Sequence, residues 1–126
     1  MSGRQLIVPL LISLAGCGRS SSDGLPATPL FVGVEGHSYA QGTSLIQHRL
    51  AARFPTGSSV RELKDYLEHQ GLQVEPTAHS STPNGGEASS KYGGPICGSE
   101  IHASWEADGA GKIESIDVLY SDSGCP

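Results

Sequence analysis

Residues 101–120, which read IHASWEADGAGKIESIDVLY, decide the fold because they predict a β-hairpin. Apolar and polar residues alternate over residues 101–107, as they do in a strand with one buried and one solvent-facing side. The glycine-rich residues 108–112 predict a turn. A second apolar alternation then predicts a returning strand that ends at Tyr120. We therefore expect two antiparallel strands in the C-terminal third of the chain.

Two apolar residues of this hairpin need their own interpretation. Ile113 is out of phase by one residue with the apolar set Ile116, Val118 and Tyr120. A β-bulge near residues 114–115 restores the phase, because a bulge adds one residue to one strand. Trp105 is the only tryptophan, and we expect it to anchor the core. The alternative is an exposed aromatic side chain that binds a partner.

Cys97 and Cys125 flank the predicted hairpin. The residue numbers of opposed pairs in an antiparallel ladder have a constant sum, which the turn sets at 220 and one bulge residue moves toward 221. The two cysteines add to 222, so they lie within a residue or two of direct opposition, where the Cα separation suits a disulfide. We predict this disulfide in an oxidising compartment. The alternative is two unlinked buried thiols.

The segment before Pro55 predicts a helix that begins near residues 43–44. Its apolar stripe consists of Ile46, Leu50 and Phe54, which recur at four-residue spacing. The helix is expected to end before Pro55, because the residue before a proline is pushed out of the helical region.

A second helix is expected from residue 59 onward. Ser59 and Glu62 fit a capping box, and Gly71 fits the left-handed residue that closes many helices. The linker between the two helices is short, so they should pack as a hairpin. The apolar face of this helix comprises Val60, Leu63, Tyr66 and Leu67.

The remaining segments are predicted to form a short strand, a long loop and a weak edge strand. Residues 72–75 alternate as a strand, and residues 30–34 fit an edge strand that glycine weakens. Residues 77–95 are rich in Ser, Gly, Pro and Asn, and such loops are either functional or mobile; composition favours mobility. Residues 30–126 thus predict a single small α+β domain, with a two-helix hairpin packed on a small antiparallel β-sheet.

The N-terminal segment is typical of a secretory signal peptide. Arg4 precedes an apolar run over residues 6–14, which is too short to span a bilayer and is interrupted by Pro9. The run ends in Leu14-Ala15-Gly16-Cys17, which resembles the lipobox of bacterial lipoproteins. An ordinary secretory signal is the alternative.

The lipobox resemblance implies that residues 1–16 are removed and that Cys17 carries acyl chains such as palmitate. Residues 17–29 would then be the lipidated N-terminus and a flexible tether. The protein would lie in the bacterial cell envelope, on the outer membrane facing the periplasm in a Gram-negative cell. Lipid on Cys17 also leaves Cys97 and Cys125 as a pair.

Composition bears on partners and chemistry. The 126 residues include 13 acidic and 8 basic side chains, with a formal net charge of −5, so nucleic acid is a poor partner. The five histidines lack the paired spacing of a zinc site, and no Gly-x-Ser-x-Gly elbow is present. We expect no metal, no cofactor and no catalytic residues, hence a protein that is not an enzyme.

Residues 57–67, GSSVRELKDYL, are similar to the Gly-x-[Ser/Thr]-x-x-x-[Val/Leu]-x-x-x-Leu helix of BamE-type (SmpA/OmlA) lipoproteins. The resemblance implies their two helices on a small antiparallel sheet, an architecture shared with β-lactamase-inhibitor-like domains, and it implies no functional residues.

From the anchor and the small domain we expect a non-enzymatic module that binds an envelope protein or supports an envelope assembly. The alternatives are a periplasmic inhibitor or immunity-type binder of a hydrolase, and a small hydrolase. The polar side of the predicted hairpin, with His102, Ser104 and Glu106, is the candidate contact surface.

Overall fold

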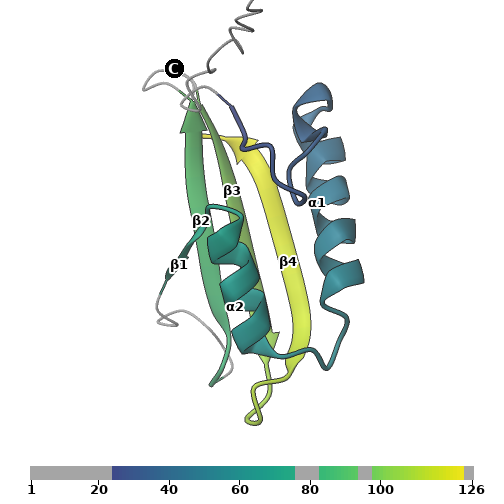
Figure 1. Cartoon of the computed structure of the whole chain (residues 1–126), viewed down its shortest axis with the longest axis vertical. Coiled ribbons are helices and arrows are strands. Elements are labelled where there is room, and N and C mark those ends of the chain that lie inside the picture. The colour runs from purple at the N-terminus through teal and green to yellow at the C-terminus, as the bar shows by residue number, and fades with distance from the viewer. Residues whose placement is uncertain (1–23, 76–82, 94–97, 124–126) are drawn as a thin grey trace, which may run out of the picture.

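The computed structural model describes residues 24–75, 83–93 and 98–123, and within them it confirms the predicted α+β fold (Figure 1). Two helices lie on one side of a four-stranded antiparallel sheet whose strands follow the order of the sequence. The elements are the 3-10 turn η2 (Val34–Gly36), α1 (Tyr39–Arg53), α2 (Val60–His69), β1 (Gln73–Glu75), β2 (Gly86–Gly93), β3 (Gly98–Ala107) and β4 (Ile113–Asp122).

The C-terminal hairpin and its bulge are confirmed. Ala107 pairs with Ile113, whereas Glu106 pairs with Ser115, so Glu114 is the extra residue of the bulge. In the turn, the Asp108 carboxylate accepts hydrogen bonds from two backbone N–H groups, at 2.9 Å each. The expected phase shift of Ile113 follows, because the bulge turns its side chain into the core.

Helix α2 has the expected bounds, but its start is held differently from the prediction. The Ser59 side chain accepts no capping hydrogen bond, so the predicted capping box is wrong. Backbone hydrogen bonds to the hairpin replace it: Val60 N–H donates to the Gly111 carbonyl at 3.0 Å, and Ile113 N–H donates to the Ser58 carbonyl at 2.8 Å. The tertiary contact therefore fixes the helix start.

The end of α2 follows the prediction. Gly71 has φ of 96°, and its N–H donates to the Glu68 carbonyl while Leu72 N–H donates to the Leu67 carbonyl. This is the Schellman arrangement, and it places Leu72 in the core beside Leu67.

Helix α1 begins earlier than predicted. Its first residue is Tyr39 rather than a residue near 43–44, and Ser38 and Gln41 form a reciprocal capping box. Gly42 obscured this start because glycine is a weak helix former. Here Gly42 lies against Tyr120, and a Cβ would come within 2.7 Å of the tyrosine ring. Close packing explains the glycine.

The predicted loop 77–95 is wrong over residues 86–93, which form β2 between β1 and β3. Its composition is that of a loop, but two neighbouring strands supply its hydrogen bonds. Gly86 lies so close to Trp105 that a Cβ would be 2.8 Å from the indole ring. The small residues of β2 thus make room for the indole. Residues 77–82, 94 and 95 lie outside the described part of the chain.

The N-terminal part of the domain differs from both predictions made for it. Residues 30–34 form turns and the start of η2, not an edge strand, and Leu30 is buried. The Leu30 N–H donates to the Gln70 side chain at 3.1 Å, and its carbonyl accepts from Arg49 at 3.0 Å. The folded domain also starts before residue 30, because Leu25 packs against the core. The tether boundary at residue 29 is therefore too late.

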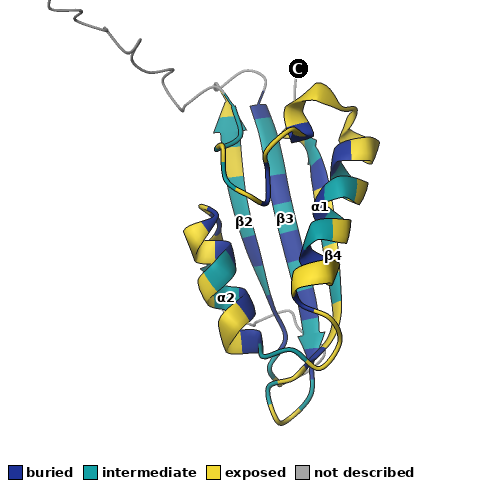
Figure 2. Cartoon of the chain, turned by 45° about the vertical axis from the view of Figure 1, so that its right-hand side comes forward, coloured by how far each residue is buried: buried dark blue, intermediate teal, exposed yellow. Residues whose placement is uncertain are grey.

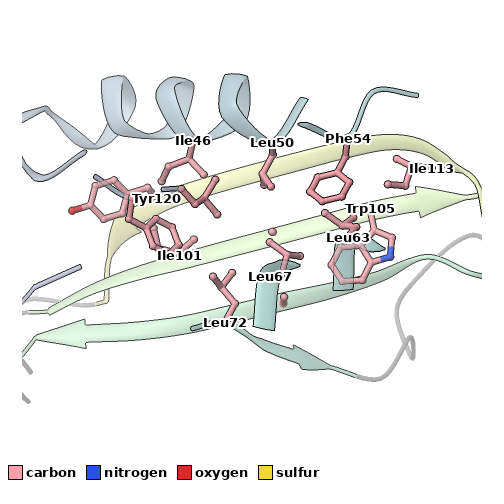
Figure 3. Packing of buried hydrophobic residues seen from close by; sticks show 14 of the residues in the cluster. Ile46, Leu50, Phe54, Leu63, Leu67, Leu72, Ile101, Trp105, Ile113 and Tyr120 are labelled. Carbon is pink, nitrogen blue, oxygen red and sulfur yellow. The ribbon is translucent and has the colours of Figure 1, made fainter. Parts of the chain in front are cut away.

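The core lies between the helices and the sheet, as Figure 3 shows. Ile46 and Leu50 of α1 point toward the strands, as the predicted stripe requires, and Phe54 follows at the end of the helix. Trp105 is only 2% exposed, so its prediction as a core anchor is confirmed. Figure 2 shows buried residues on the inner faces of both helices and along β3.

Helix α1 also covers the free edge of β4 with polar side chains. The Gln47 amide donates to the Ile116 carbonyl at 2.7 Å and accepts from the Val118 N–H at 2.8 Å. The Thr43 hydroxyl makes the equivalent pair of contacts with the Tyr120 backbone, at 3.2 and 3.0 Å. These contacts satisfy backbone groups that an edge strand otherwise leaves open to another chain.

Candidate contact surface on the sheet

No described helix covers the outer side of the sheet, since both helices pack on its other side (Figures 1 and 2). Strand pairing decides which side chains share this outer side, because directly opposed residues point the same way. We call it the open face, and it consists of Gln73, Glu75, Glu87, Ser89, Lys91, Glu100, His102, Ser104, Glu106, Ser115, Asp117, Leu119 and Ser121.

The three predicted contact residues lie on the open face. His102, Ser104 and Glu106 occupy successive outward positions of β3, and each is half-buried between its neighbours. His102 stands opposite Leu119, and Ser104 opposite Asp117. The predicted polarity of this side is confirmed, and the role of these residues in binding stays a prediction.

His102 lies next to a carboxylate of the neighbouring strand β2. Its Nε2 lies 3.5 Å from a carboxylate oxygen of Glu87, and the two side chains are 41% and 32% exposed. Exposed pairs of this kind contribute about 0–1 kcal/mol to stability. The imidazole therefore stays in contact with solvent beside Glu87.

The open face has a net negative charge. It has five carboxylates and one cation, Lys91, so its formal charge is −4 with neutral histidine. Helices α1 and α2 together carry four basic and three acidic side chains. The two sides of the molecule thus differ in charge, and the acidic side is the one without a helix.

Sequence reasoning missed Leu119, which is 57% exposed and lies on the open face at its edge strand β4. The sequence does contain a signal for it. Leu119 is apolar although it occupies an outward position, between the inward-facing Val118 and Tyr120. Leu119 adds one apolar side chain to this otherwise polar surface. It extends the candidate surface from β3 to β4.

A groove at the ends of the helices is a weaker candidate. Its aromatic wall is Phe54 and Tyr66, whose ring centroids are 5.3 Å apart. The guanidinium carbon of Arg53 lies 4.4 Å from the Tyr66 centroid, so the chain's own cation covers the aromatic surface. The lining residues are Pro29, Arg53, Phe54, Glu62, Asp65, Tyr66, His69 and Gln70.

Other predicted features fall partly or wholly outside the described residues. Cys17, Cys97 and Cys125 all do, so neither lipidation nor the disulfide is tested. Where β3 and β4 are described, Ser99 pairs with Asp122, a sum of 221 as the bulge argument expected. In residues 24–75, 83–93 and 98–123, no three or more His, Cys, Asp and Glu side chains are grouped to hold a metal ion.

None of the helices in the described segments is long and apolar enough to cross a bilayer. No family model, curated protein or solved structure matches the chain.

Proposed function

We propose that this chain is a non-enzymatic cell-envelope lipoprotein, anchored through acyl chains on Cys17, that binds another protein through the open face. The observation that carries the proposal is the uncovered side of the sheet, with Leu119 exposed on its edge strand β4. A sheet of this kind commonly buries one side on its own helices and leaves the other to solvent or to a partner.

The anchor rests on the position of Cys17. The thiol directly follows Leu14-Ala15-Gly16 at the end of a short apolar run. Two or more acyl chains give stable membrane attachment, whereas one chain gives marginal attachment. An acidic domain gains nothing from anionic head groups, so lipid on Cys17 would be the membrane attachment.

Two measurements test the proposal. Mass spectrometry of protein from its native host should show a mature N-terminus at Cys17 with added acyl mass. A photo-reactive residue placed at Leu119 in the full chain should form adducts with a specific protein in intact cells. The matched control is the same residue at Glu68, which is exposed on α2. Equal adducts at both positions, or none at Leu119, would refute binding through the open face.

The acidity of the open face favours a second candidate, an inhibitor or immunity-type binder. Enzymes that cleave anionic polymers have cationic substrate clefts, and an acidic surface complements such a cleft. A Leu119 adduct with a secreted hydrolase, together with loss of its turnover on addition of the purified chain, would select this candidate over an envelope assembly role.

A further inference from the structure

We infer that the partner of the open face is a protein with a cationic surface around an apolar contact. The inference rests on the proposed function, because it names the partner of the same surface. Three carboxylates, Glu75, Glu87 and Asp117, lie in one row across the four strands, with Ser104 between the last two. Neighbouring strands are about 4.8 Å apart, so the row concentrates negative charge within about 15 Å.

Most of this charge is not neutralised within the chain. In the part that the structure describes, Glu87 has the half-exposed His102 at 3.5 Å, and neither Glu75 nor Asp117 has an ion pair. Lys91 stands in another row, opposite Glu100. A cation on a partner would therefore gain attraction without displacing an internal cation from this row.

Charge also excludes three other occupants of the open face. A second copy would bring one acidic face against another, and like charges in contact cost several kcal/mol across an interface. Anionic lipid head groups and nucleic acid phosphates would be repelled in the same way. A protein with lysine or arginine at its surface is the occupant that this face attracts.

Leu119 supplies the apolar contact, on the edge strand β4 of the open face. It stands opposite His102, and the two are flanked by the carboxylate row on one side and by Glu100 and Lys91 on the other. The face measures about 20 Å by 15–20 Å from strand spacing and residue rise, or roughly 300–400 Å². Standard interfaces bury about 800 Å² per partner, so the open face alone supports a small, electrostatically steered contact.

The first test measures charge recognition with a defined probe. A fluorescent lysine-rich peptide with a central leucine is titrated into the full chain in non-ionic detergent. The double variant Glu75→Gln/Asp117→Asn should weaken binding about three- to tenfold, and the effect should shrink in high salt. The matched control, Glu62→Gln/Glu68→Gln on exposed positions of α2, makes the same change in net charge and should alter binding by less than about twofold.

Two results of this titration would overturn the inference. Equal weakening by the two double variants would mean that only net charge matters. Equal binding of a peptide with glutamate in place of lysine would mean that the face does not select cations. Circular dichroism melts of all variants confirm that each is folded, and all four substituted side chains are exposed, so folding should be retained.

The second test separates the inference from the proposed function. Adducts at Leu119 that disappear in Glu75→Gln/Asp117→Asn, but persist in the α2 control variant, support both the binding function of the open face and the cationic partner. Leu119 adducts that survive in both double variants leave the docking function standing and refute the cationic partner. Absence of Leu119 adducts refutes the docking function, whereas the peptide titration still decides whether the face selects cationic ligands.

Discussion

The Gln47→Ala variant tests whether α1 stabilises the fold by closing the edge of β4. The substitution removes two hydrogen bonds, one to the Ile116 carbonyl and one from the Val118 N–H, at 2.7 and 2.8 Å. Each hydrogen bond of this type contributes about 0.5–1.5 kcal/mol, so we expect a loss of about 2 kcal/mol. The higher helix propensity of alanine offsets this loss of stability by a few tenths of a kcal/mol. For a domain of this size the loss lowers Tm by about 8–16 °C.

Urea unfolding followed by circular dichroism measures this loss directly. The control is His48→Ala, which shortens a neighbouring exposed side chain of the same helix for which no such contact with β4 is seen. Light scattering adds a second readout, because an uncovered edge strand promotes pairing between chains. If Gln47→Ala unfolds within 0.5 kcal/mol of the His48→Ala control and stays monomeric, the edge-closing role of α1 is wrong.

Three further substitutions probe the interior. Gln70→Leu leaves a buried backbone N–H without its acceptor and should cost about 1–3 kcal/mol in urea unfolding. Gly86→Ala forces a Cβ against the Trp105 ring and should cost about 1–3 kcal/mol, whereas Gly109→Ala, in open space, should be near neutral. Burial raises the pKa of Tyr92 above its ordinary value of 10.0, so the folded chain keeps this proton after the unfolded chain has lost it. The resulting stability is complete below pH 10 and falls as pH rises through the raised pKa. Tyr92→Phe should flatten that alkaline loss in unfolding experiments between pH 9 and 11, and an unchanged slope would contradict the assignment.

The features that the sequence predicted well depend on neighbours along the chain. The alternation around Trp105, the bulge at Glu114 and the glycine end of α2 each follow from a few consecutive residues. Such signals are read correctly because periodicity and turn chemistry are local. Their success also fixed the pairing of β3 with β4 without any knowledge of the other strands.

The features that it missed depend on contacts between distant segments. Strand β2 is poor in β-forming residues and exists because β1 and β3 pair with it. The first turns of α1 contain Gly42, because the ring of Tyr120, which is distant in sequence, leaves no space for a Cβ there. The start of α2 is held by the hairpin turn rather than by its own serine. Tertiary packing overrode local propensity in all three cases.

The sequence predicted only part of the candidate contact surface, because the surface also combines residues from strands that are distant in sequence. His102, Ser104 and Glu106 lie on one strand, so alternation alone placed them together. Glu87 could not be added to them, because the composition of its strand predicts a loop. Leu119 could have been added from the hairpin register, since it stands opposite His102.

The acidic row of the open face destabilises the folded domain. Carboxylates that served the fold would stabilise it, so the effect of these residues on stability distinguishes a binding role from a structural one. Glu75 and Glu87 are directly opposed, and like charges in opposed positions of a sheet are destabilising. On α2, by contrast, Lys64 precedes Glu68 by four residues, a spacing at which opposite charges attract.

The stability of the open-face variant therefore carries information that binding alone does not. Glu75→Gln/Asp117→Asn should leave the free energy of unfolding unchanged or raise it by up to about 1 kcal/mol, while it weakens the lysine peptide. The α2 control variant should lose a few tenths of a kcal/mol and keep its binding. Urea titrations at low salt give the clearest reading, because salt screens both effects. A marked loss of stability in the open-face variant would show that these carboxylates serve the fold, and their placement on an uncovered sheet would then say nothing about a partner.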